Sequence, residues 1–246
     1  MGCVALALHS GCMLVGPKWV SLFDGKTLNG WKQLDGAAKF EVVEGTIVGT
    51  ITPGQKLNSF LVTEDDSFGD FIFECEFKIE PGFSQGGTGV QFRSRPADAK
   101  TRRVHGYQYE MDQSPRALTA GIQEEGGVWR REGVEAEAKH LATASATAMP
   151  GAFWLAPVKN SGEPAKEWVR VHGDILKFND WNTARIEARG THLRTWLNGQ
   201  LMADIEDNFE GRIPRGFFGL QVHRTDDPKA LGKRVWFRNL RVQRLD

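Results

Sequence analysis

The sequence predicts an all-β protein, built as a two-sheet antiparallel sandwich of the jelly-roll type. Roughly ten short runs alternate apolar and polar residues, which is the period of a strand. The 28 glycines punctuate these runs, and segments with the period of a helix are scarce. Many short strands separated by turn residues are typical of sandwiches and barrels. The 246 residues are enough for one large domain of this class.

The bulk composition excludes several classes of function. The chain has 31 basic and 31 acidic residues, so no net charge directs it to nucleic acid or to an anionic membrane. The three cysteines, Cys3, Cys12 and Cys75, cannot all pair, and they have no C-x-x-C spacing. A zinc knuckle or redox pair is therefore not indicated. Cys75 lies in an alternating apolar run and is expected to act as a small buried hydrophobe.

Residues 1–18 form an apolar segment about as long as the core of a signal peptide, although no Lys or Arg precedes it. Ser10-Gly11-Cys12 resembles the end of a lipoprotein processing site, with His9 where Leu is usual. We expect the remnant of an export signal, and so a periplasmic or extracellular protein, with a lipid anchor, a disordered tail and a misassigned start as open alternatives. No stretch has the length of a membrane-spanning helix.

The first strands follow from turn signals. Trp19 to Trp31 contains Asp24-Gly25 and Asn29-Gly30, which predict a short opening strand folded back on itself. Phe40 to Ile51 predicts a hairpin that turns at Glu44-Gly45. The chain is therefore expected to begin with three closely spaced strands.

The later strands are predicted by alternation between turn residues. Phe71 to Ile79 is the clearest, with aromatic residues on one face and charged residues on the other. Asn198-Gly199 is a strong hairpin signal. The remaining predicted strands are Ser59–Thr63, Gly89–Ser94, Val104–Asp112, two short strands within Ala120–Arg131, Trp181–Arg189, His192–Leu197, Gln200–Ile205, Gly216–His223 and Trp236–Arg244.

One segment departs from this regularity. Residues 132–180 contain Pro150, Pro157 and Pro164 and an Ala-rich run, Glu135 to Ala148, that could form a helix or a loop. A long excursion inside a compact domain is more often a functional lid than a second domain. We therefore predict a single jelly-roll domain over residues 19–246, with a long loop excursion at about 132–180.

Three predicted strands share a feature that indicates a site. Each places polar side chains in a row on the face opposite its apolar residues. If these strands are neighbours, the rows merge into a patch roughly 10–15 Å across, given a strand spacing of about 4.8 Å. Amides and charges together suit a polyhydroxylated ligand, because each sugar hydroxyl both donates and accepts. The rows are Gln91 and Arg93, then Gln108, Glu110 and Asp112, and finally Gln221 and His223.

Each member also has a structural interpretation. Arg93 could simply pair with Glu110, His223 could be a satisfied structural histidine, and Asp112 could cap the turn that follows it. Glu110, Asp112 and His223 could also bind a divalent metal, although nothing in their spacing is diagnostic. No other cofactor is indicated. Tryptophans available as stacking walls are Trp31, Trp129 and Trp154.

Several motifs resemble one known family. Leu22-Phe-Asp-Gly-Lys-Thr-Leu-Asn-Gly-Trp31 resembles the opening signature of the 3-keto-disaccharide hydrolases, which belong to the concanavalin A-like lectin/glucanase superfamily. The resemblance covers roughly residues 19 to 245, and residues 132 to 178 look longer than is usual in the family. It continues through Thr88–Ser94, Gly106–Asp112, Trp181-Asn182, Trp196–Gly199 and Gly219–His223.

This resemblance implies a concanavalin A-like jelly roll that acts on sugars oxidised at C3, usually in exported bacterial proteins. A 3-keto group acidifies the C2 proton, and the glycosidic oxygen on C1 is then a β leaving group. A base takes the proton, a donor stabilises the enolate, an acid assists departure, and water adds afterwards. We assign the base to His223 or Glu110, with Asp112 orienting His223 or contributing to a metal site. The substrate-binding residues would be Gln91 and Arg93 at the keto oxygen, with Gln108, Gln221, Trp129 and Glu124.

Two other functions remain open. Jelly-roll glucanases carry Glu-x-Asp-x-Glu on one strand face. Here the pattern reads Gln108-x-Glu110-x-Asp112, so a retaining pair would need Glu124 or Glu125 as its partner. A non-catalytic lectin-like module would need only the polar face and the tryptophans. In every case the expected partner is a sugar or glycoside, and the oligomeric state is open.

Overall fold

A computed structural model describes residues 18–83, 87–97, 103–126, 153–156 and 174–246. Residues 1–17, Trp129, the Ala-rich run and most of the excursion at 132–180 lie outside these described residues, as does the second strand predicted after Gly126. In the described part the elements are strands and one short 3₁₀ turn, Pro228–Ala230. No helix among these residues is long and apolar enough to cross a membrane.

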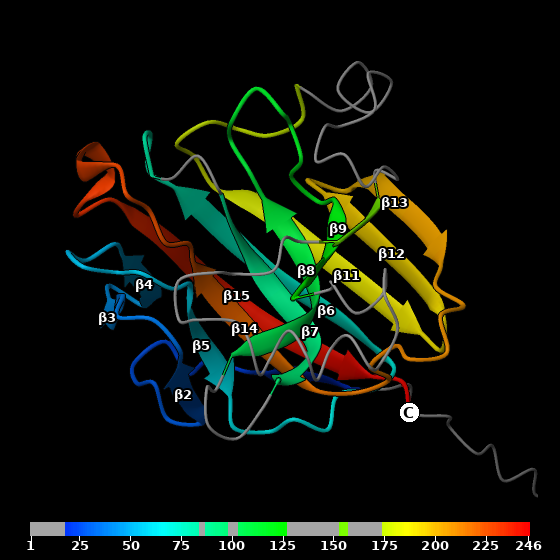
Figure 1. The fold of residues 1–246 in the computed structure, drawn as a ribbon. Helices are drawn as coiled ribbons and strands as arrows, with labels where there is room; N and C mark the ends of the chain where they lie inside the picture. Colours follow the sequence, from blue (N-terminus) through cyan, green and yellow to red (C-terminus); the bar gives the residue numbers. More distant parts are fainter. Residues whose placement is uncertain (1–17, 84–86, 98–102, 127–152, 157–173) are drawn as a thin grey trace, which may run out of the picture.

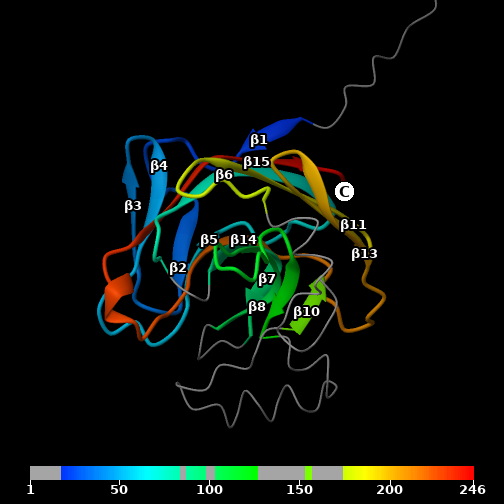
Figure 2. The same ribbon diagram turned by 90° about the horizontal axis from the view of Figure 1, so that it is seen from above.

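The described strands form two antiparallel sheets that face each other (Figures 1 and 2). Sheet A is the eight-stranded sheet of this part of the chain, and sheet B is the seven-stranded one. Sheet A has the order β13 (Gln200–Glu206), β12 (His192–Leu197), β11 (Asn182–Arg189), β6 (Phe71–Ile79), β15 (Arg234–Arg244), β4 (Thr46–Thr50) and β3 (Lys39–Val43), with β1 (Trp19–Ser21) paired to β15. Sheet B has the order β10 (Phe153–Ala156), β9 (Ile122–Glu125), β8 (Val104–Met111), β7 (Thr88–Pro96), β14 (Phe217–Val222), β5 (Ser59–Thr63) and β2 (Trp31–Leu34).

The core lies between the inner faces of the two sheets. Phe218 on β14 packs against Phe68, Phe71 and Phe73, with ring centroids 4.5–4.7 Å apart, and so ties sheet B to sheet A. Cys75 on β6 is 1% exposed within this cluster, as its alternating run predicts. Along β6 the inward apolar residues alternate with outward Glu74, Glu76 and Lys78, which is the pattern of a sandwich. A second, smaller buried apolar cluster is formed by Leu34, Phe60, Val62, Val104 and Phe217.

The predicted fold class is confirmed: the protein is all-β, with two antiparallel sheets of jelly-roll type. The hairpin of β3 and β4 turns at Glu44-Gly45, both with positive φ. The hairpin of β12 and β13 turns at Asn198-Gly199, where φ is +50° and +84°, as a two-residue type I′ turn requires.

The opening strand was predicted wrongly. It does not fold back on itself, because β1 pairs with β15 in sheet A whereas β2 pairs with β5 in sheet B. The turn residues of this stretch instead carry the chain from one sheet to the other. Trp31, considered as a stacking wall, is buried in the core, and its indole N–H donates to the Leu22 carbonyl at 2.7 Å.

Candidate functional site

The strands with the polar rows are neighbours in sheet B, in the order β14, β7, β8 and β9. Gln91 on β7 pairs in register with Gln108 on β8. In the next row Gly89 has Gln221 on one side and Glu110 on the other. These side chains point away from the core, because their chain neighbours on the same strands belong to it. The prediction that the three strands lie side by side is confirmed.

Hydrogen bonds join the polar side chains into one network centred on Gln108. Its Oε1 accepts a bond from Gln91, and its Nε2 donates to Glu110 Oε2 at 2.8 Å and to Gln221 Oε1 at 3.3 Å. Gln123 on β9 donates to the same Glu110 oxygen at 2.7 Å. Since all five residues are at most 7% exposed, their orientations are fixed by these bonds.

A second carboxylate closes the network at its other end. Glu125, at the end of β9, accepts from Gln221 Nε2 at 3.4 Å and from Asn58 Nδ2 at 3.1 Å. Asn58 is held in turn by the backbone N–H of Arg224, which donates to its Oδ1 at 2.9 Å. Glu110 and Glu125 are therefore linked through Gln108 and Gln221.

Two glycines make room for this network. A Cβ on Gly89 would come within 2.7 Å of the Gln108 side chain and 2.6 Å of the Tyr109 carbonyl oxygen. A Cβ on Gly87, whose φ is +72°, would lie 2.6 Å from Glu110 Oε1. The strand in the middle of the face thus has no side chain where its neighbours' polar groups cross it.

Burial sets the protonation of both carboxylates. Loss of hydration, and then the negative charge of Asp112, raise the pKa of Glu110 well above its usual range. Loss of hydration raises the pKa of Glu125 to about 7, against hydrogen bonds from Asn58 and Gln221 that lower it. Burial therefore favours the protonated form of Glu110. Because its Oε2 accepts two amide bonds, Oε1, beside Gly87, is the oxygen available to carry a proton.

His223 lies half-buried just beyond the end of β14. Its Nδ1 is 2.5 Å from the carbonyl oxygen of Arg224, which can only accept, so the neutral ring carries its proton on Nδ1 and its acceptor on Nε2. Burial lowers the pKa of His223 below its usual value, as does the charge of Arg116, while Asp112 opposes the shift. The imidazole is therefore neutral near pH 7 and can accept a proton.

Asp112 holds the turn after β8. Its Oδ1 accepts from the Ser114 backbone N–H at 2.8 Å, and its Oδ2 accepts from the Ser114 hydroxyl at 2.9 Å. Arg116 lies 3.0 Å from the same Oδ2. Asp112 thus caps this turn, and it fixes a guanidinium whose charge acts on both Glu110 and His223.

Arg93 is not on the polar face, contrary to the prediction. The β7 register shifts between Phe92 and Arg95, and Arg93 has a φ of +45°, so the bulge turns its side chain away. The guanidinium donates to the carbonyls of Gly69 and Gly190 and to Asp70 Oδ1 at 2.9 Å. It stabilises the fold, and the alternative pairing with Glu110 is wrong as well.

Other predicted residues do not share the face. Glu124 pairs in register with the core residue Tyr107 and alternates with Gln123 and Glu125, so its side chain points to the inner side of sheet B. In the described ranges, no three His, Cys, Asp or Glu side chains gather in a way that could hold a metal ion. The metal donor set considered for Glu110, Asp112 and His223 does not fit, because Arg116 and Ser114 already occupy the Asp112 oxygens.

Several residues of the site were not predicted from the sequence. Gln123 and Arg116 were not identified, and Glu125 was considered only as a glycosidase partner. Alternation along the strand could have predicted Gln123 and Glu125, because a strand with Ile122 facing the core places both of them on the outer face. No local signal distinguishes Gly87 and Gly89 from the other glycines of that loop, since their role depends on the strand across from them.

The fold and the site define the class: an all-β jelly-roll sandwich with a face of amides and carboxylates on one sheet. The sequence profile of the 3-keto-alpha-glucoside-1,2-lyase-like domain family matches residues 18–243, and the chain belongs to this family. It is 23% identical to the 3-keto-disaccharide hydrolase of Bacteroides thetaiotaomicron, over 93% of this chain and 79% of that protein.

Solved structures show the same fold. A candidate glycosyl hydrolase from Parabacteroides distasonis superposes with a TM-score of 0.55 at 17% identity, covering 93% of this chain and 94% of that one. The exoplasmic domain of VIP36, bound to Ca²⁺ and Man3GlcNAc, superposes with a TM-score of 0.51 at 12% identity, covering 94% and 91%. These likenesses establish the sandwich architecture.

Proposed function

We propose that this protein cleaves the glycosidic bond of 3-keto-glycosides or 3-keto-disaccharides by proton abstraction at C2, elimination and hydration. The observation that carries the proposal is that the charge of Arg116 acts both on the Glu110 carboxyl, whose protonated form burial favours, and on the His223 imidazole, whose neutral form burial favours. This combination supplies an acid, a base and a cation, which are the groups that the elimination needs.

The roles follow from the protonation states. His223 Nε2 takes the C2 proton, and the electron pair moves onto the C3 carbonyl to form an enolate. Arg116 stabilises the enolate oxygen, in the role first assigned to Arg93. Glu110 gives its Oε1 proton to the leaving oxygen as the C1–O bond breaks. Glu110 then takes back a proton from the attacking water, whose hydroxyl adds to C1. C2 gains a proton from solvent and His223 gives up its proton to solvent, so that both residues are restored and the net reaction is hydrolysis.

A hollow beside this end of the face offers a place for the leaving group. Its volume is about 330 Å³, and it is lined by Gln113, Ser114 and Thr225, which are near neighbours in sequence of Asp112 and His223. Phe178, which is 64% exposed, lies on its wall and gives it an aromatic surface for a sugar ring.

The test uses the α and β anomers of 4-nitrophenyl 3-keto-glucoside, with the unoxidised glucosides beside them. We expect 4-nitrophenol release from a keto substrate only. In D₂O the released 3-keto-glucose gains deuterium at C2, above the exchange measured without enzyme. Release without this deuterium would contradict the elimination.

Variants test the residue roles. Glu110→Gln and His223→Asn should each lower kcat about 10²- to 10⁴-fold, the usual contribution of a general acid or base. Glu64→Gln is the matched control, since Glu64 is exposed on the loop after β5. Unchanged turnover in both site variants would refute the assignment.

Direct glycoside hydrolysis is a second candidate function, because the outer face of sheet B holds two carboxylates, Glu110 and Glu125. Burial favours the protonated form of Glu110, and Glu125, with a pKa of about 7, is partly ionised at neutral pH. A proton donor paired with an ionisable carboxylate is the arrangement that glycosidases use. Hydrolysis of the unoxidised 4-nitrophenyl glucosides, abolished by Glu125→Gln, would favour this function over the first.

A further inference from the structure

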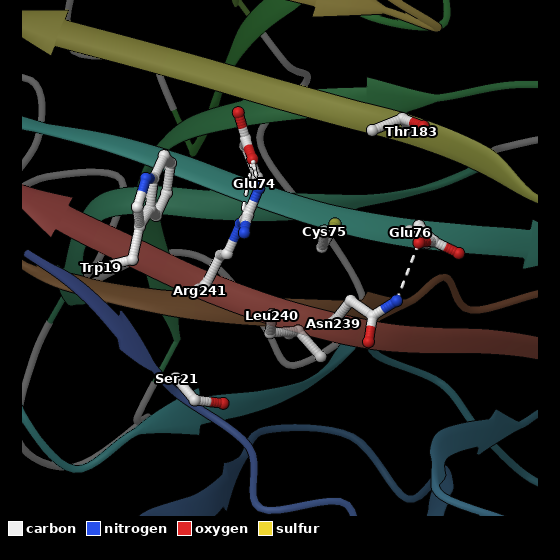
Figure 3. Close-up of a pocket in the computed structure, with 9 residues that line it drawn as sticks. All are labelled: Trp19, Ser21, Glu74, Cys75, Glu76, Thr183, Asn239, Leu240 and Arg241. Atoms are coloured by element: carbon white, nitrogen blue, oxygen red, sulfur yellow. Dashed lines mark hydrogen bonds and ion pairs between the residues drawn. The ribbon is translucent and has the colours of Figure 1, made fainter.

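A second groove lies on the outer face of sheet A, on the other side of the sandwich from the network just described. Figure 2 shows β1 outside β15 and β6, away from β7 and β8. The groove has a volume of about 460 Å³ and is bounded by residues of β1, β6, β11 and β15 (Figure 3). This volume is in the range of small-molecule sites.

A bulge in β15 creates the hollow. The register with β6 shifts between Arg238, which pairs with Glu76, and Arg241, which pairs with Glu74. Asn239 and Leu240 therefore oppose the single residue Cys75. Asn239 has a φ of +54°, and Leu240 turns into the core at 1% exposure, so no long side chain fills the space between the two glutamates.

The carboxylates on either side of the hollow are held rigidly. Glu74 accepts from Arg241 at 2.6 and 3.0 Å and from Arg185 at 2.6 Å. Glu76 accepts from Arg238 and from Asn239, both at 2.8 Å. Groups fixed before a ligand arrives lose little entropy on binding. Each carboxylate oxygen can also accept further bonds from hydroxyls.

One end of the groove carries an aromatic surface. Trp19 on β1 is 37% exposed, and its ring is held by the Arg241 guanidinium, 4.5 Å from the ring centroid. In Figure 3 Trp19, Arg241 and Glu74 gather at one end, and Glu76 and Asn239 at the other, with Leu240 between. A flat apolar ring beside fixed acceptors and donors suits a pyranose, which has an apolar ring face and polar hydroxyls.

We propose that this groove binds a hexose unit of an unoxidised, uncharged glycan, as a second carbohydrate site of the protein. The guanidinium in the lining, Arg241, is already paired with Glu74, so the groove offers a uronate no unpaired cation. The groove would hold the protein on a glycan while the face of sheet B carries the reaction. The inference does not depend on which reaction that is.

The test is native affinity electrophoresis in gels containing soluble barley β-glucan, dextran, glucomannan or polygalacturonate. We expect at least one neutral polysaccharide to retard the protein and polygalacturonate not to. Trp19→Ala should weaken this retardation at least about tenfold, because a tryptophan that supplies the apolar surface of a contact carries much of its affinity. Thr183→Arg, which places a long side chain over the groove from an exposed position on β11, should do the same without removing a contact.

Val20→Ala is the matched control, since Val20 is 54% exposed on the same strand but is not part of the groove lining. Val20→Ala and Glu110→Gln should be retarded like the wild type. Turnover of the 3-keto-glucosides should be unchanged in Trp19→Ala and Thr183→Arg. No retardation by any neutral glycan, or equal retardation of wild type and both groove variants, would overturn the inference. Absence of turnover with Trp19-dependent retardation would contradict the proposed function alone.

Discussion

At the scale of single residues, the environment decides the chemistry of the acidic groups near this face. Asp112 is buried but is held by Ser114 and Arg116, which satisfy its charge. Glu110 and Glu125 are also buried, but the hydrogen bonds to their carboxylates come from amides, which compensate a charge less well than a guanidinium does. The pKa values of Glu110 and Glu125 consequently rise.

Glu125 makes stability depend on pH. Its pKa rises from 4.5 to about 7 on folding, so the folded state holds the proton more tightly. This stabilisation is complete below pH 4.5 and is lost as the pH rises through about 7, by roughly 3 kcal/mol in total. Between pH 5 and 8 the melting temperature of the wild type should fall more than that of Glu125→Gln. Parallel pH curves for the two proteins would contradict this prediction.

At the scale of elements, the polar face depends on the absence of side chains at two glycines, one just before β7 and one within it, and on a bulge in β7. Gly87 and Gly89 leave the space that Glu110 and Gln108 occupy, and the bulge after Phe92 removes Arg93 from the row. A regular strand with side chains at these positions would separate β14 from β8 by a ridge. Gln221 and Gln108 can bond across β7 because Gly89, which lies between β14 and β8 at this point, has no side chain.

Gly89→Ala should therefore disrupt the network. The added methyl would lie 2.7 Å from Gln108 and 2.6 Å from the backbone oxygen of Tyr109, which cannot move without breaking the strand pairing. We expect a loss of about 1–3 kcal/mol in the free energy of unfolding and a fall in turnover of at least tenfold. Urea unfolding and 3-keto-glucoside turnover measure the two effects.

Gly199→Ala separates these effects. Its φ of +84° strains an alanine, but nothing lies within 4 Å of the new methyl. This variant should lose stability with no loss of turnover per folded molecule. Equal losses of turnover in both glycine variants would show that stability alone explains the Gly89 result.

At the scale of the whole molecule, the two sheets are joined by one aromatic cluster. Phe218 from β14 meets Phe71 and Phe73 of β6, with Phe68 beside them. The two outer faces are thus supported by the same core, although they carry different side chains: amides and buried carboxylates on sheet B, ion pairs and tryptophans on sheet A.

Because both sheets depend on this cluster, unfolding should be a single transition. Phe218→Ala should lower the free energy of unfolding by about 3–5 kcal/mol, the usual cost of deleting a fully buried ring. Far-UV and near-UV circular dichroism during urea unfolding should give coincident transitions in both proteins. Two separated transitions in the wild type would contradict a shared core.

The sequence by itself determined the fold class, most strand positions and the shared polar face. Alternation is a local property, so it correctly predicted that Gln91, Gln108, Glu110 and Gln221 leave the core. Alternation was wrong for Arg93, because a bulge inserts one extra residue and so reverses which face the following side chains occupy. Sequence alone does not show where a strand bulges.

Only the tertiary structure decided how the face works. The pKa of each carboxylate and the need for glycine at particular positions depend on residues that are distant in sequence. Asn58, which donates a hydrogen bond to Glu125, is an example. The opening β1 shows the same limit, since its turn residues were recognised but its partner, β15, lies at the other end of the chain. Strand pairing, burial and pKa are set by neighbours in space, and these are properties that a local pattern does not contain.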